Sequence, residues 1–241
     1  FRLDLTLVDL SARDPSGLGL NLPRLEAEAY MHAPHHWVLA APRGLTFVRP
    51  EGGPVTVSGR MIHASARSLD SRPPAISIEG FGLRFDPAPS ARPFSVASAE
   101  RAQFHLRPGP GGQGAILVKV DGGRATPGTV AGALAGSAPF EFVWDSLVAH
   151  ADRVTGPSVG PALASWRAAG GRLDVREAHL TTAASGVAAG SGAWLSLAPD
   201  GALEGRLPLA ANGQGPSGVL ELTSGRIRLG GADLGPAPRL P

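Results

Sequence analysis

The chain has 241 residues, of which 43% are hydrophobic and 17% are charged, so it is long enough and apolar enough to fold around a core. Its formal net charge is only +2, and the basic residues are scattered among 20 acidic ones, which excludes the clustered basic patch of a nucleic-acid-binding protein. The absence of cysteine excludes disulfides, thiol catalysis and cysteine-ligated zinc.

Alternation of apolar and polar residues begins with the first residues of the chain. Phe1, Leu3, Leu5 and Leu7 are separated by polar residues, a period of two that is typical of a strand with one buried face. The phase of this alternation changes at Pro23 and again around Gly80, where we expect a sheet edge or a β-bulge. Similar patterns predict further strands at residues 18–22, 25–29, 76–78, 81–85, 104–106, 116–120 and 173–175, and hairpins over residues 195–209 and 219–229.

Helix signals are confined to the middle of the chain. Residues 140–154 are one candidate, and residues 161–169 are a better one, because Pro161 suits a first turn and Gly170 ends the helix. Helices between two runs of strands favour a mainly β (α+β) fold over repeated β-α-β units. We therefore expect large curved antiparallel sheets with one or two short helices within residues 140–169.

The domain organisation follows from the same pattern. We expect one elongated domain over residues 1–241, or two lobes, residues 1–126 and 137–241, joined by a segment rich in glycine and proline.

Three of the seven histidines, His32, His35 and His36, lie within five positions and are the candidates for a metal site. Pro34 disfavours a helix here, so a strand is the expected conformation. On a strand, His35 and His36 point to opposite sides, and His32 and His36 are roughly 13 Å apart. Only a tight turn at Pro34 could bring these rings within about 2 Å of one zinc ion. We therefore expect no metal and no cofactor.

Residues 156–160 match the Gly-x-Ser-x-Gly pattern of a hydrolase nucleophile elbow, with Ser158 at its centre. An elbow requires an apolar strand directly before the serine, and the polar residues before Gly156 do not supply one. His179 is the only histidine downstream that could act as a base. We expect a linker that starts a helix here, and no enzyme.

The four tryptophans are the remaining large apolar groups: Trp37, Trp144, Trp166 and Trp194. Buried tryptophan usually belongs to a core. The alternative is that these rings, with Leu163 next to Trp166 on a helical face, line a groove for an apolar ligand.

Several glycine and tryptophan spacings resemble those of a domain-of-unknown-function family of proteobacterial envelope proteins. In the C-terminal half these are residues 166–175, 190–205, 225–230 and 234–238, and in the N-terminal half residues 1–5, 36–37, 41–42 and 64–67. The family has no established active site, so the resemblance transfers no catalytic residue. It implies a periplasmic or periplasm-facing protein, with a membrane-proximal segment upstream that anchors it to the inner membrane. A more distant, purely architectural resemblance is to AsmA-like and lipoprotein-carrier-like proteins, whose curved sheets hold acyl chains.

These observations together predict a non-catalytic protein that binds lipid or another apolar ligand in a hydrophobic groove of a curved sheet. The alternative is an interaction module with a filled core that docks another envelope protein through an exposed sheet edge.

Overall fold

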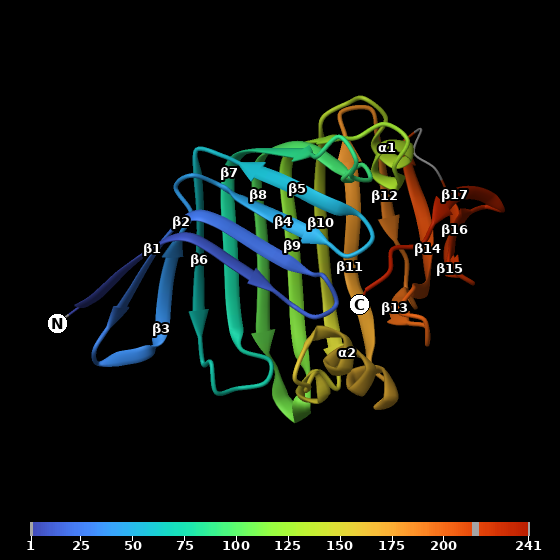
Figure 1. Ribbon diagram of the computed structural model, residues 1–241. Helices are drawn as coiled ribbons and strands as arrows, with labels where there is room; N and C mark the ends of the chain where they lie inside the picture. Colours follow the sequence, from blue (N-terminus) through green and yellow to red (C-terminus); the bar gives the residue numbers. More distant parts are fainter. Residues whose placement is uncertain (1, 214–216, 241) are drawn as a thin grey trace.

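The computed structural model describes residues 2–213 and 217–240, and it is mainly β, as the sequence predicts (Figure 1). Phe1, part of the first predicted strand, lies outside the described residues. The described strands form one antiparallel sheet of 17 strands. They are β1 (Arg2–Arg13), β2 (Gly19–Tyr30), β3 (Ala33–Ala40), β4 (Leu45–Arg49), β5 (Gly53–Ser58), β6 (Met61–Arg67), β7 (Ala75–Pro87), β8 (Val96–Pro108), β9 (Gly114–Ala125), β10 (Phe140–Ala149), β11 (Arg172–Thr182), β12 (Ser185–Ala189), β13 (Trp194–Leu197), β14 (Leu203–Gly213), β15 (Gly218–Thr223), β16 (Arg226–Leu229) and β17 (Ala232–Pro236).

Four helical segments interrupt the strands. Two are α-helices, α1 (Val130–Ala135) and α2 (Val159–Ala168), and two are single 3₁₀ turns, η1 (Pro110–Gly112) and η2 (Ala151–Arg153). The helix predicted at residues 161–169 corresponds to α2. Helix α1 was not predicted from the sequence; Thr129 caps its first turn by accepting a hydrogen bond from the backbone N–H of Gly132.

The predicted helix at residues 140–154 is wrong, because this segment forms strand β10 followed by η2. Strand β10 pairs along its length with β9 on one side and β11 on the other. Its even-numbered residues, including Phe140, Phe142 and Val148, form one apolar face. Aromatic and β-branched side chains at every second position favour a pleated surface, and the two neighbouring strands supply the hydrogen bonds that decide the conformation.

The sheet divides twice along its width. Strand β2 pairs with β3 through Glu26–Tyr30 and with β4 through Gly19–Asn21, and these two arms continue as β6 and β5 before both pair with β7. From β7 to β11 each strand pairs with the next along the chain. A second division occurs where β11 pairs with both β12 and β13, which rejoin at β14. Strands β15, β16 and β17 complete the sheet.

The structure has a sheet irregularity near each of the two positions where the alternation changes phase. One lies at Pro23, as expected, and the other lies two residues after Gly80. Pro23 lies where β2 is paired with neither β3 nor β4, and Asp9 opposite it has a φ of +53°. Proline suits this gap because it has no N–H to donate to a ladder. The second irregularity is at Gly82, with a φ of +59°, and not at Gly80, so Phe81 points to the opposite face from Leu83.

The N-terminal strands form a second layer over the long strands. In Figure 1, β1, β2, β4 and β5 cross in front of β7–β10, with β1 and β2 forming a long hairpin. The largest core cluster joins the two layers, since Leu22 of β2 packs with Val120, Phe140 and Leu180 of the long strands, and Leu45 and Val57 pack against the same cluster. We call the face of β7–β10 that is turned toward this layer the inner face, and the opposite one the outer face.

Candidate functional site

The inner face carries two continuous rows of side chains, each crossing nine strands from β1 to β11. Neighbouring members of a row are directly paired in the ladders, so they lie side by side. The first row is Leu5, Ala27, Leu39, Ala64, Ile78, Phe104, Val118, Trp144 and Ala178. The second row is Leu3, Ala29, Trp37, Ala66, Ile76, Leu106, Ile116, Ser146 and Val175. Every member is apolar except Ser146, so the sheet presents a wide hydrophobic wall.

Two cavities lie against this wall. Cavity 2 has a volume of about 610 Å³ and is bounded by the first row through Ile78, Phe104 and Val118, with Leu45 and Val57 from the covering layer. Its described lining includes two residues with polar side chains, Ser95 and Gln103. The amide nitrogen of Gln103 is already engaged, because it donates a hydrogen bond to the Glu79 carboxylate on the outer face at 3.2 Å. Cavity 2 is therefore almost wholly apolar.

Cavity 1 has a volume of about 650 Å³ and is bounded by the second row through Ile76, Leu106 and Ile116. Helix α2 closes one side with Leu163 and Trp166. The Trp166 indole N–H donates to the carbonyl oxygen of Ala149 at 2.7 Å, and its ring lies on Gly171, where any larger residue would collide with it. These contacts fix the ring as part of the wall.

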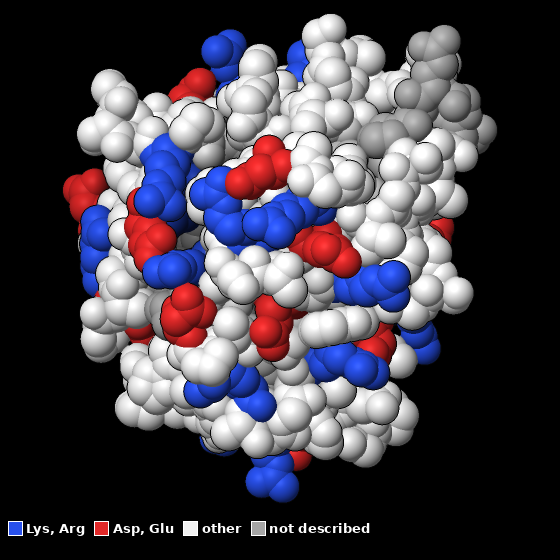
Figure 2. Space-filling model, turned by 90° about the vertical axis from the view of Figure 1, so that its right-hand side faces the viewer, with Lys and Arg blue, Asp and Glu red and all other residues white. Residues whose placement is uncertain are grey.

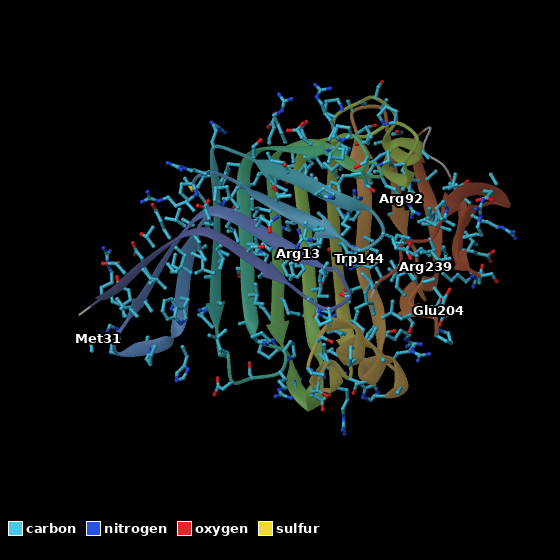
Figure 3. All side chains as sticks on the ribbon, viewed as in Figure 1. Arg13, Met31, Arg92, Trp144, Glu204 and Arg239 are labelled. Atoms are coloured by element: carbon cyan, nitrogen blue, oxygen red, sulfur yellow. The ribbon has the colours of Figure 1, made fainter. Side chains whose placement is uncertain are left out.

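The two cavities are adjacent because their rows are adjacent. Ile76 lines cavity 1 and Ile78 lines cavity 2, and two residues along a strand span roughly 7 Å. On β10 the step between them is occupied by Trp144 and Ser146, whose side chains line neither cavity. The Trp144 indole N–H donates to the Ser146 hydroxyl oxygen at 2.9 Å, and Ser146 is fully buried. Trp144 lies about midway along β10 (Figure 3) and packs against the core of the C-terminal strands. We call the two cavities and this wall the apolar trough.

The apolar trough reaches solvent along its first row. Ile78, in the wall of cavity 2, is 42% exposed, and Leu5 and Leu3 at the β1 end of the two rows are 42% and 51% exposed. The mouth of cavity 1 also has apolar residues at the surface, namely Leu69, Val154 and Leu240. A ligand could therefore enter without unfolding of the sheet.

The structure separates the site residues proposed from the sequence. Leu163 and Trp166 are brought together in the wall of cavity 1, and Trp144 lies between the cavities. Trp37 belongs to the second row but lines neither cavity. Trp194 lines neither cavity, although the next three residues of β13 line cavity 1.

The three clustered histidines do not converge. His35 and His36 are neighbours on β3, so they point to opposite sides. The His32 ring lies tilted beside the ring of Tyr30, with 5.3 Å between the ring centroids. Within residues 2–213 and 217–240, no group of three or more His, Cys, Asp or Glu residues has a geometry that could hold a metal ion.

Ser158 occupies the N-cap position of α2, and its side chain makes no capping hydrogen bond. The segment before it contains the 3₁₀ turn η2 and a loop, where a nucleophile elbow would need a strand. His179 lies on β11, where it pairs with the carboxylate of Glu177 at 3.2 Å. The geometry thus gives Ser158 the role of starting a helix.

The sequence reasoning missed the aromatic and aliphatic residues of the long strands that line the cavities, above all Phe104, Phe142 and Ile116. The alternation of these residues predicts strands, but it does not indicate which strands border a cavity. Arg72 was also missed: it is the only charged residue among the described residues that line either cavity.

The surface charge is mixed. Figure 2 shows Lys and Arg side chains interspersed with Asp and Glu across the middle of one face of the molecule. In the part of the chain that the structure describes, no helix is both long enough and apolar enough to cross a bilayer.

Comparison with known proteins identifies a family. The family described as "Uncharacterized protein conserved in bacteria" (DUF2125) matches residues 1–216. No curated protein matches the chain, and no solved structure matches it. The comparisons do not show the more distant resemblance to AsmA-like proteins. Because the match covers most of its length, the chain belongs to the bacterial family DUF2125.

Proposed function

We propose that the protein binds a lipid or another molecule with an acyl chain in the apolar trough, without catalysis. The observation that carries this proposal is the pair of cavities, about 650 and 610 Å³, set side by side on one hydrophobic wall. Both volumes fall within the range of small-molecule sites, which are mostly apolar with few polar groups.

The energetics support an apolar occupant. A space lined by hydrocarbon costs stability, because the lining atoms have no packing partners on one side. Each methylene group of a ligand that leaves water for such a site contributes about 0.8 kcal/mol. The hydrocarbon chain of a fatty acid or lipid therefore gains enough free energy from burial to bind without any directional contact.

Binding of a fluorescent fatty acid to delipidated protein tests the proposal. Ala102→Leu narrows cavity 2 and Leu195→Phe narrows cavity 1, since both residues line those cavities. The control is Ala115→Leu on the outer face of β9, opposite Arg107 and Leu147. We expect the wild type and the control to bind equally, and at least one narrowed variant to bind roughly tenfold more weakly. A wild type that takes up no fatty acid, or narrowed variants that bind like the control, would contradict the proposal.

A second candidate function rests on strand β1. Its ladder partner within the described residues is β2 alone, so the other edge of this 12-residue strand is free to pair with a partner protein. Val8, 64% exposed, gives that edge an apolar contact. Thr6→Pro should hinder such pairing by disturbing the backbone of β1, at a residue that lines neither cavity. Loss of a stoichiometric partner in this variant, with fatty acid binding unchanged, would favour docking over lipid binding.

The proposed location is the periplasm or the periplasmic side of the inner membrane. It is supported by the resemblance to proteobacterial envelope proteins and by the surface-accessible apolar trough, which suits exchange with membrane lipids. Fractionation of cells that express the full-length protein tests this location, and recovery from the cytosol alone would contradict it.

A further inference from the structure

A single positive charge, that of Arg72, lies at the mouth of cavity 1 in the apolar trough. Arg72 lines this cavity from the loop between β6 and β7, and it is exposed to solvent. No carboxylate is among the described residues that line the cavity. The ion pairs and side-chain hydrogen bonds found within residues 2–213 and 217–240 do not include the Arg72 guanidinium.

The loop that carries Arg72 is held in place. The Ser71 hydroxyl hydrogen-bonds to the carbonyl oxygens of Ser68 and Pro73, at 2.7 and 2.9 Å. Pro73 is buried and lies close to Gly114 and Ala151. A Cβ atom added at Gly114 would lie 3.1 Å from the side chain of Pro73 and 3.1 Å from that of Ala151. The backbone that carries Arg72 is therefore held beside η2, at the edge of cavity 1.

Two other polar side chains that line cavity 1 already have hydrogen-bond partners within the protein. The Ser196 hydroxyl is engaged with the carbonyl oxygen of Gly171 at 2.7 Å, and the Ser71 hydroxyl is engaged within its own loop. The other hydroxyl of the described lining belongs to Thr155. The mouth thus combines one cation with the exposed apolar side chains of Leu69, Val154 and Leu240. This arrangement matches a molecule with a hydrocarbon tail and a negatively charged head.

We infer that cavity 1 is selective for an anionic amphiphile, with one acyl chain inside the cavity and a carboxylate or phosphate paired with Arg72. The inference deepens the proposed function and rests on it. The planar guanidinium of arginine binds the two oxygens of a carboxylate or phosphate through paired hydrogen bonds, which a neutral head group cannot form. Since the rest of the lining is uncharged, this one group sets the preference.

The experiment compares decanoate, decyl phosphate and decanol, which share one chain length and differ in the head group. Affinities are measured by displacement of a fluorescent fatty acid from delipidated protein at about pH 8, where the carboxylate is ionised. We expect the wild type to bind at least one anion roughly fivefold to tenfold more tightly than decanol. The tighter of the two anions identifies a fatty acid or a phosphate-bearing lipid as the natural source.

Two variants assign the preference to Arg72. Arg72→Gln should lower anion binding to the level of decanol while leaving decanol binding unchanged, and Arg72→Glu should make anions bind more weakly than decanol. The control is Arg43→Gln, an exposed arginine that lines neither cavity and should bind like the wild type. Equal binding of anions and decanol by the wild type would overturn this inference but leave acyl-chain binding standing. Absence of binding by all three compounds would overturn both.

Discussion

The carboxylate of Asp14 accepts a hydrogen bond from the backbone N–H of Val159 at 2.8 Å, although the two residues are 145 positions apart. Asp14 lies at the tip of the β1–β2 hairpin, and Val159 is the first residue of α2. The contact therefore ties the layer that crosses the inner face to the helix that closes one side of cavity 1. Hydrogen bonds from Ser16 and from the Val159 N–H lower the pKa of Asp14 below its ordinary value, so the tie is made by the ionised carboxylate.

Asp14→Ala should loosen this tie. We expect bound fatty acid to dissociate a few-fold faster, with little change in its association rate, because the variant removes a contact that holds the covering layer in place over the bound chain. Stopped-flow displacement measures both rates. Asp86→Ala, an exposed carboxylate on β7, is the control and should leave both rates unchanged. Identical dissociation rates in the two variants would show that the hairpin does not restrict ligand release.

Acidification should act on the same contact. The pKa of Asp14 is lowered in the folded protein, so its stabilising contribution is complete above the unfolded value near 3.8 and is lost as the pH falls through the folded value. The dissociation rates of the wild type and Asp14→Ala should therefore converge in acid.

Trp144→Ala should join the two cavities. On β10 the indole lies between Phe142, which lines cavity 2, and Val148, which lines cavity 1, so we expect its removal to open space between the two cavities. We expect the longest fatty acid that binds with full affinity to increase in length, and the free energy of unfolding to fall by about 3 kcal/mol. A series of fatty acids of increasing length measures the first effect, and urea denaturation measures the second.

The companion variant is Ser146→Ala, which removes the hydrogen bond of Trp144 but keeps its ring. We expect its chain-length preference to stay that of the wild type. If Trp144→Ala also kept that preference, Trp144 would not separate the cavities.

Glu79 should stabilise the outer face. Its carboxylate pairs with Arg101 and with the Nε2 of His63 at 3.1 Å, and it accepts a hydrogen bond from Gln103. The side chain is only 20% exposed, so Glu79→Gln should lower the free energy of unfolding by about 1 kcal/mol at neutral pH. Glu28→Gln, which affects an exposed ion pair with Arg2, is the control and should have no measurable effect.

The effect of Glu79→Gln should depend on pH. The hydrogen bond from Arg101 is the main reason that the pKa of Glu79 is lowered from its ordinary value of 4.5. The carboxylate therefore stabilises the fold fully above that value, and its contribution disappears as the pH falls through the folded pKa. The difference between wild type and variant, measured by urea denaturation, should shrink below about pH 4.5. A difference that stays constant into acid would show that charge is not its cause.

Several of the strands were predictable from the sequence because their signal is local. The alternation of Leu3, Leu5 and Leu7 matches β1, and that of Ile116, Val118 and Val120 matches β9. Residues 140–149 were not predictable in the same way. Their apolar residues also fit a helical face, and the pairing with β9 and β11, which lie outside the segment itself, decides between the two.

The sequence predicts that the candidate site is hydrophobic, but it does not predict which residues line it. Apolar rings and the absence of a reactive cluster suggest a hydrophobic groove, but which ring faces it depends on how strands are placed over one another. Trp166 lines cavity 1 because Gly171 and the Ala149 carbonyl hold it there, whereas Trp194 on β13 lines neither cavity. Arg72 carries no local signal, since its role arises from where its loop meets η2.

The proposed function requires that acyl chains occupy the inner face of the sheet. Native mass spectrometry of protein purified from its source without detergent measures this directly. We expect a population heavier by the mass of a lipid or fatty acid, which Ala102→Leu or Leu195→Phe reduces and Ala115→Leu does not. A single species at the mass of the bare polypeptide, unchanged after incubation with fatty acid, would contradict it.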